Sequence, residues 1–407
     1  MNETIAIIGG GPAGLFCALL SAGVGRTVIV FEKKPAPGRK LLITGSGQCN
    51  ITHAGETADF LSRYGDHGTF LRPALMNFTN RDLITFFADR GLRTETEPGG
   101  KVFPATRKSA DVLAVLLAEC AARGVEIRHS DPVLEVERDN DGFLVTTKAG
   151  TTRAGTLVIA TGGASYPATG STGDGYAFAR ALGQPTTEVA PALAPVYVED
   201  YPFADLAGIS FQNLTLSVYR DGKRVGQHTG DLLFTHTGLS GPGILDLSRA
   251  VRPGDVLRVA FLSGATSEEV RKLLTDAVAA GGARQVKSVL SGLPLPERFV
   301  RRLLDLAGVP ADETCAHLGK KARNALAASL AEFPFRVARL GGFNEAMATR
   351  GGVALEGINP KTMASKIVPD LYCIGEVLDI DGDTGGYNLQ AAFSTAALAA
   401  RHITASR

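Results

Sequence analysis

Short apolar runs near the start of the chain predict a βαβ unit. Thr4–Ile8 is almost wholly apolar, as in a buried parallel strand, and Ala13–Leu20 is apolar and helix-favouring. A second, β-branched run follows at Thr27–Phe31. The buried-strand pattern returns at Thr156–Ala160 and again at Leu371–Ile374. We therefore predict an α/β fold whose main sheet collects strands from both ends of the chain.

The middle of the chain has a different pattern. Alternating apolar and polar residues with turn signals predict antiparallel strands from Ala194 to Leu262. Helical spacing then takes over, beginning with a capping box at Thr266–Glu269. The predicted organisation has three parts. A discontinuous α/β domain comprises 1–190 and 336–407, a strand-rich inserted subdomain comprises 191–262, and a helical inserted subdomain comprises 263–335.

Composition and charge exclude several classes of protein. Of the 407 residues, 44% are hydrophobic and 20% charged, which is typical of ordered globular chains. The net charge of +1 gives no bulk attraction for nucleic acid or an anionic membrane, and no apolar run reaches the ~20 residues of a membrane helix. Five scattered cysteines without a C-x-x-C pair argue against a metal site and a redox disulfide. Because no signal-like basic segment begins the chain, we expect a cytoplasmic protein acting on a small molecule.

A glycine motif follows the first predicted strand. Gly9 to Gly14 read Gly-Gly-Gly-Pro-Ala-Gly, which contains G-x-G-x-x-G between a strand and a helix. Gly9 permits a tight turn, Gly11 lets the backbone approach a pyrophosphate, and Gly14 allows close packing of helix on strand. Glu32 ends the next strand, where it can bond ribose hydroxyls and repel a ribose phosphate. The motif predicts FAD or NAD rather than NADP, and the alternative is a glycine turn without a ligand.

Later strand ends favour FAD over NAD. Thr161-Gly162-Gly163 and Gly375-Glu376 each follow a buried strand, and Gly385-Gly386 precede the last helix. Since the carboxyl ends of parallel strands meet at one edge of a sheet, we expect these turns to contact the same ligand. A ligand that spans turns from the start, middle and end of the chain is extended, which suits FAD.

Three segments resemble one family within the flavoproteins of the glutathione reductase type. They are GRKLLITGSGQCNIT at 38–52, LFTHTGLSGP at 233–242 and GEVLD at 375–379. The family is that of the aminoacetone-oxidase-like flavoproteins, which includes bile-acid enone reductases. The resemblance covers nearly the whole chain and implies non-covalent FAD and an inserted β-barrel followed by a helical part. Gln48 is a departure, because arginine is commoner there in the family.

The resemblance and the motifs together give a set of cofactor-binding residues. The loop Thr44–Asn50 is expected to lie against the isoalloxazine ring and ribityl chain, and the last helix to direct its N-terminal dipole at the flavin pyrimidine oxygen. Either Glu376 or Asp379 is expected to bond the ribityl or phosphate region. The predicted set is Gly9, Gly11, Pro12, Ala13, Gly14, Glu32, Lys33, Arg39, Lys40, Thr44, Gly45, Ser46, Cys49, Asn50, Val133, Thr161, Gly162, Gly163, Gly375, Glu376, Asp379, Gly386, Asn388, Leu389 and Gln390.

Candidates for catalysis are fewer. His236 can relay a proton near neutral pH, although a hydrogen-bonded structural histidine is the simpler interpretation. Tyr387 and Asn50 are further polar candidates. A lone thiol at Cys49 is better explained as a small buried residue than as a redox group.

The leading hypothesis is a flavoenzyme that transfers hydride through flavin N5. A reductase would take hydride from NAD(P)H and deliver it to an enone-like substrate, whereas an oxidase would oxidise a small amine and reduce O2. Because the chain has a single G-x-G-x-x-G motif, NAD(P)H is expected to bind transiently. Two alternatives are an NAD-dependent dehydrogenase without flavin and a flavin-bound regulator that contacts RNA. A solvated helix face adequately explains the basic residues that RNA contact would use, and docking of NADPH phosphate or RNA there is the less favoured alternative. These residues are Arg298, Arg301, Arg302, Lys320, Lys321 and Arg323.

Overall fold

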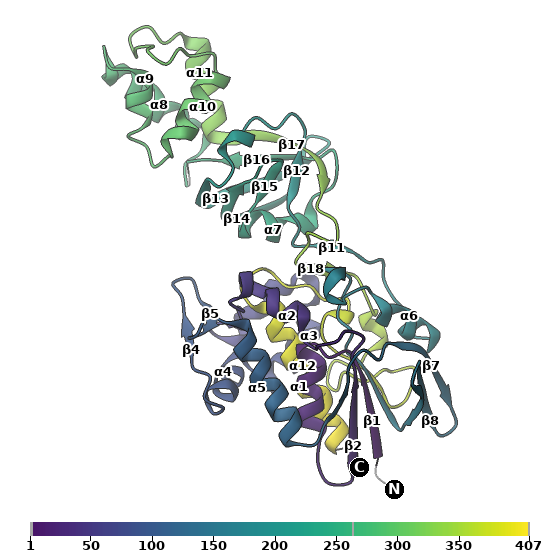
Figure 1. The fold of residues 1–407 in the computed structure, drawn as a ribbon. Coiled ribbons are helices and arrows are strands. Elements are labelled where there is room, and N and C mark those ends of the chain that lie inside the picture. Colours follow the sequence, from purple (N-terminus) through teal and green to yellow (C-terminus); the bar gives the residue numbers. More distant parts are fainter. Residues whose placement is uncertain (1–2, 263, 406–407) are drawn as a thin grey trace. The chain divides into compact units, whose positions relative to one another are not determined.

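The computed structural model describes residues 3–262 and 264–405 and divides them into two compact units (Figure 1). Unit 1 consists of the residues up to Ala192 and those from Phe343 onwards, and unit 2 runs from Leu193 to Gly342. The sequence predicts the second of these boundaries at 335/336. Strand β17 (Phe333–Leu340) accounts for the difference, because it pairs with strands of unit 2.

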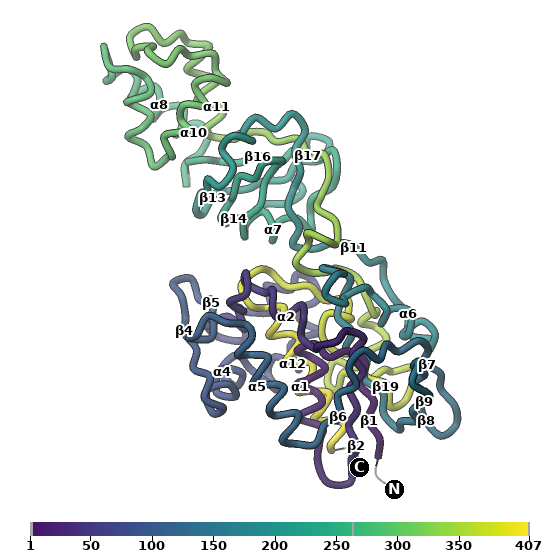
Figure 2. The backbone as a smooth tube through the Cα atoms, in the orientation of Figure 1, coloured from purple at the N-terminus to yellow at the C-terminus, as the bar shows by residue number. Residues whose placement is uncertain are grey.

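A five-stranded parallel sheet forms the centre of unit 1 and takes strands from both ends of the chain, as predicted. Figure 2 traces the backbone of this unit. Its strands, in order across the sheet, are β19 (Leu371–Cys373), β10 (Thr156–Ile159), β1 (Glu3–Ile8), β2 (Arg26–Phe31) and β6 (Glu126–Arg128). The inner strands are apolar on both faces because both faces are covered. The predicted α/β fold class with a parallel, Rossmann-like sheet is confirmed.

Helices cover this sheet and smaller sheets surround it (Figure 1). Helix α1 (Pro12–Ser21) packs against α12 (Tyr387–Ala405) and α5 (Ser109–Ala122). The other helices of unit 1 are α2 (Arg39–Ile43), α3 (Gly68–Asn77), α4 (Asn80–Ala88) and α6 (Asp174–Ala181). The smaller sheets are formed by β3 (Thr52–His53), β5 (Lys101–Pro104) and β4 (Thr94–Thr96), by β7 (Val133–Asp139), β8 (Gly142–Thr147) and β9 (Gly150–Ala154), and by β11 (Ala190–Ala192) and β18 (Ala348–Arg350).

Unit 2 has its own core, built on a closed barrel. The strands follow one another around the barrel as β12 (Val196–Val198), β15 (Gly238–Ser240), β14 (Lys223–Phe234), β13 (Ser210–Arg220), β16 (Val256–Ala260) and β17. Helix α7 (Pro242–Leu247) packs on the barrel, and four more helices follow: α8 (Ser267–Gly281), α9 (Val286–Leu290), α10 (Glu297–Leu306) and α11 (Lys320–Glu332). Contacting phenylalanine rings, among them Phe234, Phe261 and Phe299, join barrel and helices into one core. A barrel followed by helices is the predicted order.

Within residues 3–262 and 264–405, no helix has the length and apolarity needed to cross a membrane. Within the same ranges, no group of three or more His, Cys, Asp or Glu side chains is placed to hold a metal ion.

All five cysteines are buried as free thiols, which yields a first prediction. Burial raises the pKa of Cys17, Cys49, Cys120 and Cys373 to about 12, so their reactive thiolate forms are scarce at neutral pH. We expect the native protein to react negligibly with a thiol reagent such as DTNB at pH 7, and the unfolded protein to titrate five thiols. Rapid modification of Cys49 in the native protein, mapped by mass spectrometry, would contradict the buried placement of this loop.

Candidate cofactor site

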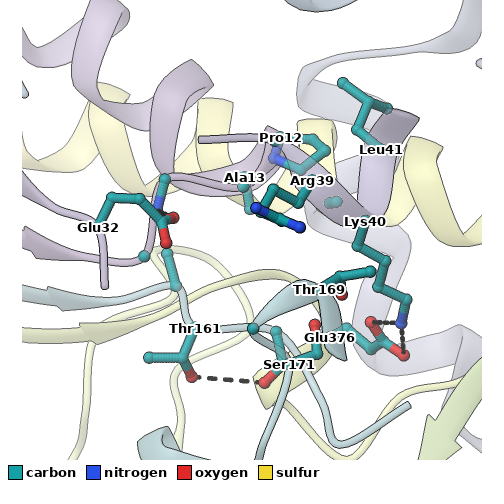
Figure 3. A pocket seen from close by; sticks show the side chains of 18 of the residues that line it. Pro12, Ala13, Glu32, Arg39, Lys40, Leu41, Thr161, Thr169, Ser171 and Glu376 are labelled. Carbon is teal, nitrogen blue, oxygen red and sulfur yellow. Dashed lines mark hydrogen bonds and ion pairs between the residues drawn. The ribbon is translucent and has the colours of Figure 1, made fainter. Parts of the chain in front are cut away.

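One pocket of unit 1 lies at the carboxyl ends of the parallel strands (Figure 3). The end of β1, the start of α1, the end of β2 and helix α2 supply much of its wall. The segment after β10, the start of α12 and the residues Val133, Met347, Ala348 and Glu376 supply the rest. Predicted cofactor-binding residues that line this pocket are Gly9, Gly11, Pro12, Ala13, Glu32, Lys33, Arg39, Lys40, Thr44, Val133, Thr161, Gly162, Glu376, Asn388 and Leu389.

The glycines of the first turn differ in what a side chain would meet. A Cβ on Gly9, which has φ +111°, would lie 2.5 Å from the Ala160 carbonyl oxygen. A Cβ on Gly14 would lie 1.9 Å from the carbonyl oxygen of Gly9. A Cβ on Gly11 would meet no atom within 4 Å. The first two glycines therefore serve packing, while Gly11 leaves open space beside the free N–H groups of α1, where a diphosphate fits.

Glu32 lies at the end of β2 with both carboxylate oxygens engaged by backbone. Oε2 accepts a hydrogen bond from Gly10 N at 3.1 Å, and Oε1 accepts one from Lys34 N at 2.7 Å. Each oxygen can still accept another hydrogen bond, since a carboxylate offers about four acceptor positions. This fixed carboxylate fits ribose hydroxyls.

Two cationic side chains of α2 line the pocket and differ in whether they form an ion pair. The Arg39 guanidinium extends into it (Figure 3), and within 3–262 and 264–405 it has no carboxylate partner. Lys40 instead forms an ion pair with Glu376, with Nζ 2.8 Å from Oε2. Arg39 is thus available to an anionic ligand, whereas Lys40 balances the charge of Glu376.

Glu376 belongs to a polar network that joins distant parts of unit 1. Its Oε1 accepts hydrogen bonds from Thr349 N on β18 at 3.0 Å and from the Ser165 hydroxyl at 3.3 Å. The wholly buried Thr349 hydroxyl oxygen in turn accepts from Ala164 N at 2.9 Å and from Ser165 N at 3.1 Å. Because its members are paired, this network holds Glu376 in one position at the pocket wall.

The loop after α2 has an unusual backbone. Ser46 and Cys49 have φ of +55° and +61°, a region that non-glycine residues rarely adopt, and Gly45 and Gly47 also have positive φ. Such strain is commonly stored at binding sites. Asn50, at the end of the loop, has a buried Oδ1 with no hydrogen-bond partner among the described residues, and Asn50 does not line the pocket.

The start of α12 contributes mainly its backbone. Asn388 and Leu389 line the pocket, but the Asn388 amide is bonded to Gly382, with N–H···Oδ1 at 2.8 Å and Nδ2–H···O at 2.9 Å. The buried Gln390 side chain accepts from Thr52 and donates to Ser394. These amides hold α12 in place, and the helix begins beside the pocket, where its N-terminus carries a partial positive charge.

The predicted catalytic residues belong to different units, with Asn50 and Tyr387 in unit 1 and His236 in unit 2. Tyr387 is buried in the core of unit 1. Its ring stacks on that of His53, with ring centroids 5.0 Å apart and ring planes at 17°. His236 is exposed in the turn between β14 and β15 of unit 2. Of the remaining cofactor candidates, Asp379 accepts hydrogen bonds from Thr187 and from Gly351 N instead of lining the pocket. The roles of all three residues stay predictions.

Three predicted glycines have packing reasons of their own. A Cβ on Gly163 would lie 2.4 Å from the Thr349 hydroxyl, one on Gly375 2.9 Å from Ala13, and one on Gly386 2.4 Å from the Thr52 carbonyl. These glycines bring segments together close to the pocket without lining it.

Some pocket residues were missed by the sequence analysis. Thr169 to Thr172, Asp174 and Phe178 follow β10, and Met347 and Ala348 precede or begin β18. The spacing of Gly170, Gly173 and Gly175 was the available signal, but it matched no motif with a known mechanism.

The contrast between two glycines gives a second prediction. Gly11→Ala should fold with the stability of the parent but bind FAD at least ~10-fold more weakly, because its methyl group would occupy the open space. Gly14→Ala should lower stability by about 1–3 kcal/mol, since its methyl group overlaps the Gly9 carbonyl. Chemical denaturation and FAD titration of both variants distinguish the effects. Equal FAD affinity in Gly11→Ala and the parent would show that the diphosphate does not bind at this corner.

Comparisons with known proteins agree with this architecture. Residues 3–402 match the family model described as HI0933-like protein Rossmann domain. The chain is 34% identical to the ribosomal RNA dihydrouridine synthase of Haemophilus influenzae over 405 residues and 31% identical to that of Escherichia coli (strain K12) over 409 residues. It is 31% identical to the 3-dehydro-bile acid delta(4,6)-reductase of Clostridium scindens over 410 residues. Each alignment covers 98% of both chains.

A solved structure supports the fold. The 3-ketosteroid delta1-dehydrogenase of Sterolibacterium denitrificans superposes with a TM-score of 0.51 at 14% identity, covering 100% of both chains. The resemblance inferred from the motifs is confirmed at the level of the family, while the aminoacetone-oxidase-like subfamily stays a prediction. The chain belongs to the HI0933-like Rossmann family, whose members are FAD-binding oxidoreductases.

Proposed function

We propose that this protein is an FAD-dependent reductase that saturates a carbon–carbon double bond conjugated to a carbonyl group, with NAD(P)H as the source of hydride. The observation that carries the proposal is one pocket lined by the open Gly11 corner, Glu32, Arg39 and the start of α12. These features suit the diphosphate, ribose and ring ends of one extended dinucleotide.

The names of the relatives support the reductive direction. Dihydrouridine is uridine whose ring double bond, conjugated to a carbonyl, has been reduced, and a delta(4,6)-reductase of a 3-dehydro-bile acid reduces ring double bonds conjugated to a ketone. The two substrates differ greatly in size and charge. What they share is a double bond conjugated to a carbonyl group. We therefore propose that the substrate of this chain also contains one.

The residues of the pocket have separable tasks in this proposal. Gly11 and the N-terminus of α1 would hold the diphosphate with Arg39, and Glu32 would hold the adenosine ribose. Glu376, fixed by Lys40 and Thr349, would bond the ribityl hydroxyls. FAD, when bound, supplies hydride chemistry at its isoalloxazine ring. The first turn of α12 would stabilise negative charge at that end of the pocket.

A uracil base in RNA is a second candidate substrate, favoured by the two dihydrouridine synthase relatives and by one feature of unit 2. On α10, Arg301 pairs with Glu297, and Arg298 and Arg302 bond to backbone carbonyl oxygens. Lys320 and Lys321, in the first turn of α11, have no acidic partner within the described ranges. Unpaired cations beside a helix N-terminus attract phosphate.

A third prediction tests the function in three steps. The purified protein should show a flavin absorbance spectrum, NADH or NADPH should bleach it under anaerobic conditions, and an acceptor should restore it. A steroid 4-en-3-one and a uracil-containing RNA, added separately, distinguish the two substrate classes, and an amine with O2 tests the oxidase alternative. A colourless protein that takes up no FAD would refute the proposal. If an amine reduces the flavin and NAD(P)H does not, the protein is an oxidase and the proposed reductase activity is wrong.

A further inference from the structure

The segment after β10 forms part of the pocket wall although it matches no known nucleotide-binding motif. We call residues 169–174 the strap. Thr169, Gly170, Ser171, Thr172 and Asp174 all line the pocket, together with residues at the ends of β1 and β2. Gly170 and Gly173 have φ of +114° and +79°, so the strap turns where other residues would be strained.

The strap is fastened to the end of β2 by one side chain. Lys33, next to Glu32, places its Nζ 2.6 Å from Asp174 Oδ2 and 2.5 Å from the Thr172 hydroxyl. The Thr172 hydroxyl donates to the other Asp174 oxygen. A Cβ on Gly170 would lie 3.2 Å from the Lys34 side chain, so the backbone of the strap rests against the same segment.

The electrostatics of the fastening are favourable but not strong. Burial opposes ionisation of Asp174, yet hydrogen bonds from Lys33 and Thr172 outweigh it and hold the pKa of that carboxyl below its ordinary value. The Lys33 and Asp174 side chains are 26% and 39% exposed. Partly exposed ion pairs are screened by water and salt, so this one can open and close.

We propose that the strap belongs to the FAD site and that the Lys33–Asp174 ion pair is a latch that retains the bound cofactor, an inference that rests on FAD binding as proposed above. Lys33 and Glu32 come from the same strand end that is expected to hold the adenosine ribose. The latch therefore closes the pocket at its adenosine end. Lys33 is thereby occupied by Asp174, which leaves Glu32 as the group that meets the ribose.

The test is the rate at which FAD leaves the full-length protein. Asp174→Asn and Lys33→Met remove one charge each, and Glu119→Gln is a matched control, because the Arg90–Glu119 pair is 25% and 24% exposed and neither residue lines the pocket. Each holoprotein is diluted into an excess of an FAD-scavenging apoprotein, and release is followed by fluorescence. We expect FAD release to be about 3- to 5-fold faster in both latch variants than in the parent and control, and the difference to shrink at high salt.

Exchanging the two charges of the latch distinguishes loss of the ion pair from misfolding of the single variants. The double variant Lys33→Asp with Asp174→Lys should slow release again relative to either single charge reversal, as only a direct ion pair predicts. Release at the parental rate from latch variants that bind FAD would overturn the latch alone, as would an equal acceleration in Glu119→Gln. A parent protein that takes up no FAD would overturn the proposed function and the latch with it.

Discussion

Close packing of the first turn against its neighbours is the constraint on which the pocket depends. Gly14 brings α1 against the carbonyl of Gly9, and Gly9 brings the turn against the end of β10 at Ala160. Both contacts are too short for any side chain. Only with this packing does the N-terminus of α1 lie at the carboxyl edge of the sheet, where its free N–H groups meet a ligand instead of a neighbouring side chain.

A second level of organisation is polar. Lys40, Glu376, Ser165 and Thr349 come from four separate segments, and their hydrogen bonds satisfy one another beside the pocket. A partly buried polar network of this kind is unfavourable if one member is missing, since a donor or acceptor is then left unpaired. The network therefore fixes where β18, the loop after β10 and the last strand end lie relative to α2, and with them the middle of the pocket.

The sequence by itself determined the features that depend on neighbouring residues. A buried strand, a glycine turn and a helix within twenty residues predict the α1 corner and Glu32, because the conformation and the ligand contact are both local. It could not show that Thr349 supports Glu376, that Tyr387 is enclosed by aromatic rings, or that Asp174 meets Lys33 across 141 positions. Those pairings join residues far apart in the chain, and only the tertiary structure decided them, because neither partner carries a local pattern that reveals the other.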